Sequence, residues 1–155
     1  MIKIAKAIYN APLYSTYYDE DYGNTIIWIK YENHIFQGES KLHKDDEGFY
    51  SQKIGYNIAL SRARQKALTW ALGREIVRYN MKNTFYQEVL GYGRKEPAEI
   101  DPTGAFKRNL KHSQSRIAAL KKIIKDEKKW LTGYLIGQDK ALESIKRLRR
   151  KDNTN

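Results

Sequence analysis

The sequence predicts an α+β fold in which a small antiparallel β-meander packs on a long helix and a basic helical hairpin follows. Three patterns predict it. Short runs of alternating apolar and polar residues fill the first 42 positions, alanines then recur at every fourth residue, and leucines and isoleucines keep heptad-like spacing beyond residue 105. We therefore expect the meander with its helix over residues 1–92, a linker over 93–104 and the hairpin over 105–152.

The N-terminal segments have the composition of strands. Residues 2–9 alternate apolar residues with polar or small ones, which is the period of a half-buried strand. Residues 14–18 predict a further strand, and residues 25–31, rich in β-branched and aromatic side chains, predict the clearest one. Residues 35–42 return as its hairpin partner. The arrangement expected from these segments is a three-stranded antiparallel meander.

A long helix is predicted after the meander, from about residue 49 to about residue 89. Acidic residues at positions 45–47 suit its start, because the helix dipole favours negative charge there. One face consists of alanines that let the helix approach a sheet closely, so we expect that face against the meander. These alanines are Ala59, Ala63, Ala67 and Ala71. Gly73 costs about 1 kcal/mol relative to alanine inside a helix, which makes it a candidate for a kink or a break.

A linker and a second helical region follow. Two prolines and three glycines between residues 91 and 104 disfavour continued helix, and Thr103 is a candidate cap for the next one. Beyond it the apolar residues with heptad-like spacing are Ile117, Leu120, Ile124 and Leu131, then Leu142, Ile145 and Leu148. Gly133 and Gly137 interrupt this pattern. The simplest interpretation is an antiparallel helix pair that turns near Gly137, and one long helix is the alternative.

The charge is distributed unevenly along the chain. The net charge is +11, yet residues 1–50 contain five lysines and eight acidic residues, a net charge of −3. The rest of the chain therefore carries +14. Segregation of this size creates a directional field that attracts polyanions, although a basic helix face can also be merely solvated. We expect the partner to be a polyanion or a complex that contains one.

Two groups of basic residues are candidates for that contact. The first lies on the middle helix and consists of Arg62, Arg64, Lys66, Arg74 and Arg78. Like charges four residues apart repel each other, so solvent ions, acidic residues or a ligand outside the helix must offset the repulsion. Arginine also forms forked hydrogen bonds to phosphates and carboxylates.

The second group lies on the outward faces of the predicted hairpin. It consists of Lys121, Lys122, Lys125, Lys128, Lys129, Lys146, Arg147, Arg149 and Arg150. Each phosphate that these residues neutralise would add to a steep salt dependence of binding. Because a lone helix pair buries little apolar area, a homodimer through a coiled coil of residues 105–150 is also expected.

Composition excludes several classes of protein. The chain has no cysteine, which excludes a disulfide scaffold, zinc fingers and thiol catalysis. It has neither the apolar run of a membrane span nor that of a signal peptide. We expect a cytoplasmic protein of the host cell with no cofactor, no metal site and no membrane partner.

One short pattern allows an enzyme as a remote alternative. Glu39-Ser40-Lys41, with Asp19 or Asp21 upstream, has the outline of the metal site of many nucleases. In such sites paired carboxylates hold a hard cation while a lysine supports the attacking water. A pattern this short recurs by chance, and no phosphate-cradling glycine loop accompanies it.

One further pattern consists of a Gly-x-x-Lys strand end, an acidic turn, and a helix with an Ala-x-x-Arg-Ala core: Gly38 to Asp46, Ile54-Gly55 and Ala59 to Leu68. Through this pattern residues 25–70 resemble a loose group of small phage-encoded proteins of Gram-positive hosts. Many members end in a lysine-rich helical segment, as this chain does. Leu42 stands where they often have cysteine, so no thiol role is transferred. The resemblance implies a mobile-element setting, accessory binding or inhibition of host defence, and no catalytic residues.

The hairpin and the following basic helix also resemble, distantly, part of a double-stranded RNA-binding domain. The first helix of that fold is missing from the expected elements. Asp45-Asp46-Glu47 replaces the lysine cluster at the start of the second helix, and these carboxylates would repel phosphates.

These observations predict a protein that acts by stoichiometric binding, without turnover. The sharpest hypothesis is an anti-CRISPR-type inhibitor that docks on an RNA-guided nuclease, a ribonucleoprotein, with its basic helices toward nucleic acid. A general DNA- or RNA-binding phage accessory protein is the alternative, and a metal-dependent nuclease is the remote one.

Overall fold

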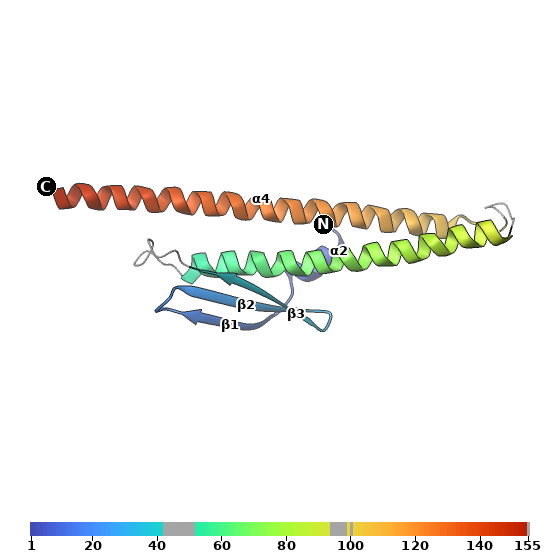
Figure 1. Ribbon diagram of the computed structural model, residues 1–155, viewed down its shortest axis with the longest axis horizontal. Coiled ribbons are helices and arrows are strands. Elements are labelled where there is room, and N and C mark those ends of the chain that lie inside the picture. Colours follow the sequence, from blue (N-terminus) through green and yellow to red (C-terminus); the bar gives the residue numbers. More distant parts are fainter. Residues whose placement is uncertain (42–51, 94–98, 100, 155) are drawn as a thin grey trace.

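The computed structural model describes residues 1–41, 52–93, 99 and 101–154. In chain order its elements are α1 (Lys3–Tyr9), β1 (Leu13–Asp19), β2 (Asn24–Tyr31), β3 (His34–Ser40), α2 (Gln52–Gly93) and α4 (Ala105–Thr154). They form three layers, with α2 between the sheet on one side and α4 on the other (Figure 1). The predicted α+β fold, a β-meander with long helices, is confirmed.

The three strands form the antiparallel meander that the alternating segments predict. The strand order is β1-β2-β3, with Thr16 opposite Ile27 and Ile29 opposite Phe36. Glu32 and Asn33 make the tight connection between β2 and β3, and both have positive φ angles, 46° and 63°. Two such residues in sequence match the twist of the strands that they join.

The strand predicted over residues 2–9 is wrong, because Lys3–Tyr9 forms the helix α1. Ala5 and Ile8 are both buried and lie three residues apart, which places them on one face of a helix, whereas in a strand they would point to opposite faces. In a segment of seven residues the two periods are hard to tell apart. The sequence predicted no helix before the meander, although a double-stranded RNA-binding domain has one there. α1 is a helix at that position. The acidic turn at 45–47 lies outside the described residues.

The alanine face of α2 packs against the sheet as predicted. Ala59, Ala63, Ala67 and Ala71 are fully buried. A Cβ atom on Gly38 of β3 would lie 1.8 Å from the carbonyl oxygen of Ala59, so the two backbones are in direct contact there. Gly73, the candidate for a kink or a break, does not break the helix, since α2 continues through that residue.

The predicted turn near Gly137 is also wrong, and the alternative of one long helix is correct. α4 runs unbroken for 50 residues, roughly 75 Å at 1.5 Å per residue. Cβ atoms on Gly133 and Gly137 would meet nothing within 4 Å, so these glycines lie on an open face and only weaken the helix. The antiparallel helix pair of this fold is α2 with α4 (Figure 1).

The end of the predicted linker caps α4. The carboxylate of Asp101 accepts hydrogen bonds from the backbone N–H groups of Phe106 and Lys107, at 3.2 and 3.0 Å. The hydroxyl of Thr103, the predicted cap, accepts the N–H of Ala105 at 3.4 Å. Two side chains thus satisfy the first free donors of the helix.

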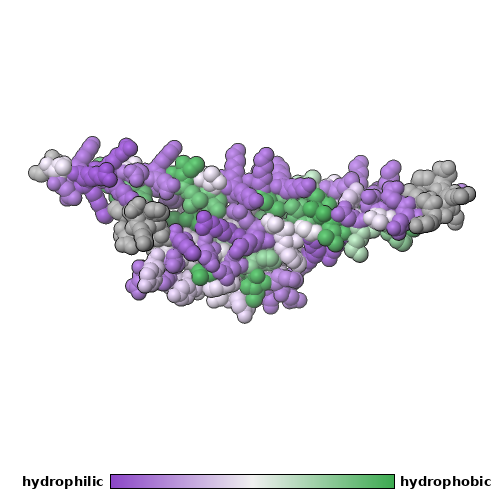
Figure 2. Space-filling model, in the orientation of Figure 1, coloured by the Kyte–Doolittle hydropathy of each residue, from purple (hydrophilic) through white to green (hydrophobic). Residues whose placement is uncertain are grey.

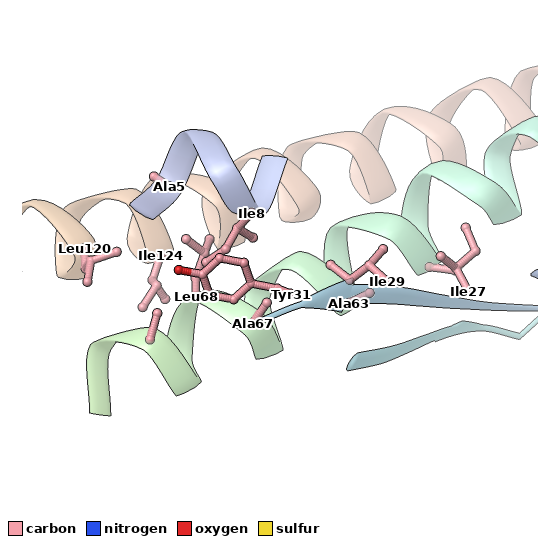
Figure 3. Packing of buried hydrophobic residues seen from close by; sticks show 12 residues of the cluster. Ala5, Ile8, Ile27, Ile29, Tyr31, Ala63, Ala67, Leu68, Leu120 and Ile124 are labelled. Carbon is pink, nitrogen blue, oxygen red and sulfur yellow. The ribbon is translucent and has the colours of Figure 1, made fainter. Parts of the chain in front are cut away.

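Among the described residues, one hydrophobic core joins the three layers. Ile29 and Tyr31 of β2, Leu68 of α2, Ile124 of α4 and Ile8 of α1 belong to one buried cluster (Figure 3). The short helix α1 covers the point where the other elements meet. α2 and the middle of α4 are therefore packed into the same core as the meander.

Candidate polyanion interface

The seam between α2 and α4 contains polar layers as well as apolar ones. Ser61, Leu68 and Glu75 lie seven residues apart on α2 and all three are buried. On α4, Ser113, Leu120 and Glu127 have the same spacing. A heptad spacing keeps one helix face toward its partner, and polar residues within such a seam fix the register.

A hydrogen-bonded junction around Glu127 joins α1, α2 and α4. The hydroxyl of Tyr9 donates to one carboxylate oxygen of Glu127, and the hydroxyl of Ser61 donates to the other at 2.7 Å. Burial, followed by the bond to the Glu127 carboxylate and its charge, raises the pKa of the Tyr9 hydroxyl well above its ordinary value. The sequence signal for this junction is an acidic residue at a seam position, between Ile124 and Leu131.

The second polar layer holds a buried carboxylate between arginines. Glu75 is 4% exposed, and its two oxygens lie 3.4 Å from Nε of Arg116 on α4 and 3.7 Å from Nη1 of Arg78. Arg116 also donates to the hydroxyl of Ser113 at 2.9 Å. The guanidinium of Arg78, a predicted site residue, therefore lies beside the buried carboxylate in the helix seam.

The other arginines of α2 bind the elements beside them. Arg62 donates from Nη1 to the carbonyl oxygen of Glu39 on β3, at 2.7 Å. Arg64 donates to the carbonyl oxygen of Tyr9 at 3.2 Å, with its guanidinium 4.9 Å from the centre of the Tyr9 ring. Both side chains therefore hold neighbouring elements against α2.

Arg74 has a similar structural environment. Its guanidinium forms an ion pair with Glu32 in the β2–β3 connection and lies 4.6 Å from the centre of the Trp70 ring. Trp70 in turn packs against Tyr31 and His34. Acidic residues and carbonyl groups of this chain therefore offset part of the repulsion between the like charges on α2.

Two of the predicted α2 residues, Arg62 and Lys66, line a groove. A groove of about 1020 Å³ lies where β3, α2 and α4 meet. It is lined by Glu39, Lys41, Arg62, Gln65, Lys66, Thr69, Trp70 and Lys128. Four cations and one carboxylate give this groove a positive potential, so an anionic group is the ligand chemistry that suits it.

The outward face of α4 carries the other predicted group. Lys122, Lys125 and Lys129 are three and four residues apart, which places them on one helix face, and all three are exposed. Within the described part of the chain none of them forms an ion pair. Figure 2 shows hydrophilic side chains projecting along this edge of α4 over most of its length.

The remaining basic residues of α4 flank this face or extend it. Lys121 and Lys128 are exposed on its side, and Lys128 reaches the groove. Near the C-terminus, Arg147, Arg149 and Arg150 are exposed and Lys146 is half-buried. Lys146 and Arg149 have interactions within the chain. Of the predicted residues, Arg62, Lys66 and Lys128 thus line the groove, and Lys122, Lys125 and Lys129 lie on the outward face of α4.

The residues of the nuclease-like pattern have other partners. The Asp19 carboxylate accepts the backbone N–H groups of Asp21 and Tyr22 in the β1–β2 turn, at 3.0 and 3.2 Å. Glu39 accepts a hydrogen bond from the side chain of Gln37 and lies 4.0 Å from Nζ of Lys41. Among the described residues no three acidic or histidine side chains gather as a metal site would require.

Comparisons with protein-family models, with curated proteins and with solved structures found no match. Within the described ranges, no helix combines the length and the apolar character needed to cross a bilayer.

Proposed function

We propose that this protein binds nucleic acid stoichiometrically, through the outward face of α4 and the adjoining groove. The observation that carries the proposal is the set of exposed lysines at positions 122, 125 and 129, which have no acidic partner among the described residues. Lysines held at a regular spacing on a rigid helix can bind phosphates with little loss of backbone freedom, and their binding releases counterions from the nucleic acid.

The groove provides a second contact of the same sign. Lys128 of α4 and Lys66 of α2 both line it, so a phosphate chain that follows α4 can continue onto α2. Trp70 also lines the groove, but it packs against the hairpin residues Tyr31, His34 and Phe36. Contacts to phosphates, rather than stacking on bases, then dominate, and binding depends little on sequence.

A more specific version of the proposal is inhibition of an RNA-guided nuclease of the CRISPR type in a phage-infected host. In this version the basic surfaces contact nucleic acid within the complex, and the N-terminal part, which carries a net charge of −3 over residues 1–50, contacts protein. The charge segregation supports a partner with both kinds of surface.

The test is nucleic-acid binding measured by fluorescence anisotropy over a series of salt concentrations. We expect Lys122→Gln/Lys125→Gln/Lys129→Gln to weaken binding at low salt at least about tenfold, and to reduce the slope of log K against log salt by about 2 to 3. The matched control is Lys3→Gln/Lys6→Gln/Lys53→Gln, which removes the same charge from exposed positions elsewhere. Equal losses of affinity in both variants would mean that binding depends on net charge alone and not on the outward face of α4.

A second measurement separates the two versions. If labelled DNA and RNA bind the wild-type protein directly, the general nucleic-acid-binding version is favoured, because no further partner is needed. If free nucleic acid fails to bind at low salt while a purified RNA-guided nuclease binds in a one-to-one ratio, the inhibitor version is favoured. Binding to neither would contradict the proposal.

A further inference from the structure

The two edges of the sheet differ in how they are covered. α2 packs over β3 and β2, and Arg62 occupies the carbonyl oxygen of Glu39 on β3. β1 lies at the opposite edge, the strand farthest from the helices (Figure 1). Its first five residues, 13–17, are all exposed. One edge is thus protected by a helix and an arginine, and the other is open.

The sequence of β1 also lacks most of the features that prevent edge strands from pairing. Residues 13–18 contain no charged residue and no proline, and Tyr, Ser and Thr predominate. Tyr14 and Tyr17 are 62% and 51% exposed. Edge strands are ordinarily protected by lysine, proline, bulges or short length. Here the one such feature is the irregular register between Leu13 and Ser15.

We propose that a second copy of this chain pairs antiparallel with β1, so that two meanders form one continuous six-stranded sheet. Such a pairing has a two-fold axis perpendicular to the sheet, and both helix layers then lie on the same face. Because α2 packs over β3 and β2, the space beside β1 stays open for the partner.

Charge favours a second copy at this edge over one at the helices. The β1 segment is uncharged up to Asp19, and a pairing centred on Thr16 places Asp19 opposite Leu13 of the partner. By contrast, the outward face of α4 is lysine-rich, and Leu120 and Ile124 of its apolar face already pack in the core that α2 shares. Two copies of α4 that met through the lysine-rich face would repel each other, so a dimer through that face is less favourable than one through β1.

The interface is small, which sets the expected strength of the dimer. Pairing of one short strand with aromatic neighbours lies at the lower end of specific interfaces, so we expect a dimer that dissociates on dilution between about 1 mM and about 1 µM. Exposed tyrosines supply cross-strand contacts, which add to the backbone hydrogen bonds.

Sedimentation equilibrium over that concentration range tests the proposal. We expect the wild-type protein to dimerise and Tyr14→Lys/Tyr17→Lys to stay monomeric with an unchanged circular dichroism spectrum. The control Tyr22→Lys makes the same change at a tyrosine that is 74% exposed but lies outside β1, and it should dimerise. A monomeric wild type, or a Tyr14→Lys/Tyr17→Lys variant that still dimerises, would overturn the proposal.

Cross-linking provides a positive test that does not depend on a disruptive change. The chain has no cysteine, so Ser15→Cys and Thr16→Cys each introduce a single thiol. An antiparallel pairing centred near Thr16 brings one of them opposite its own copy, within the Cα separation of about 4.4–6.8 Å that a disulfide spans. We expect one variant to form a covalent dimer on mild oxidation, whereas Tyr22→Cys should not. A dimer that cross-links through neither thiol of β1 would place the interface elsewhere and overturn the proposal.

Discussion

The basic residues of α2 and those of α4 come from similar sequence patterns, yet they have different surroundings in the folded chain. α2 has the sheet on one side and α4 on another, with α1 beside it. The arginines of α2 all have partners in the sheet, on α1 or on α2 itself: Arg62, Arg64, Arg74 and Arg78. α4 is packed on one face only, and its lysines at 122, 125 and 129 project to solvent. The number of layers around a helix therefore decides whether its charges stabilise the fold or remain available to a ligand.

If this comparison is correct, substitutions on α2 and its contacts should change stability, and substitutions on the outward face of α4 should change binding alone. The largest expected effect is at the contact between α2 and the sheet. Gly38→Ala places a methyl group 1.8 Å from the carbonyl oxygen of Ala59, so β3 or α2 must move. We expect a loss of about 3 kcal/mol or more in the free energy of unfolding, measured by urea denaturation.

The matched control for that variant is Gly73→Ala, where nothing lies within 4 Å of the added Cβ atom. This substitution should stabilise α2 by up to about 1 kcal/mol, because alanine favours the helix. A Gly38→Ala variant as stable as the wild type would mean that the close approach of α2 to β3 is not required.

The next largest effect is expected at the buried carboxylate between α2 and α4. Glu75→Ala leaves the guanidinium groups of Arg78 and Arg116 without their shared partner. We expect a loss of about 2 kcal/mol, which is moderate because both arginines can still reach water. Thermal unfolding compared with Glu143→Ala, an exposed glutamate of α4, checks it. Equal stability of the two variants would contradict a structural role for Glu75.

A direct test of the comparison uses one cation from each helix. Arg74→Ala removes an ion pair with Glu32 and a contact with the Trp70 ring, and we expect a loss of about 1 kcal/mol. Lys125→Ala removes no such contact and should change stability by less than about 0.5 kcal/mol. Binding should respond in the opposite order, with the larger loss for Lys125→Ala. Urea denaturation and fluorescence anisotropy on the same samples measure both effects. A larger loss of binding for Arg74→Ala, or a larger loss of stability for Lys125→Ala, would contradict the comparison.

The smallest effect is a pH dependence at the junction of α1, α2 and α4. The folded protein raises the pKa of Tyr9, so the proton is held more tightly in the folded state than in the unfolded state. The stabilisation is complete below the ordinary tyrosine pKa of about 10 and is lost as the pH rises above it. The stability of the wild type should therefore fall toward that of Tyr9→Phe as the pH rises above about 10 and through the raised pKa of folded Tyr9. Tyr22→Phe, at an exposed tyrosine, should follow the wild type throughout.

Strong local patterns predicted most of the fold. Residues 25–31 and 35–40 alternate and are rich in β-branched and aromatic residues, and both lie in strands. The alanine row predicted a close helix–sheet contact, which Gly38 completes on the other side. The segment at 2–9 was wrongly predicted as a strand because so short a segment can satisfy both periods, and the burial of Ala5 and Ile8 in the common core decided for the helix.

The sequence by itself determined the β-meander, the alanine face and the concentration of positive charge beyond residue 50, because each depends on composition or on spacing along one segment. Only the tertiary structure decided that α4 is one helix: pairing with α2 along the seam at Leu120 and Ile124 stabilises it enough to tolerate Gly133 and Gly137. It also decided which cations are neutralised. Glu32 pairs with Arg74 from 42 residues away, and the buried Glu75 of α2 pairs with Arg116 across the helix seam, contacts that no local pattern records.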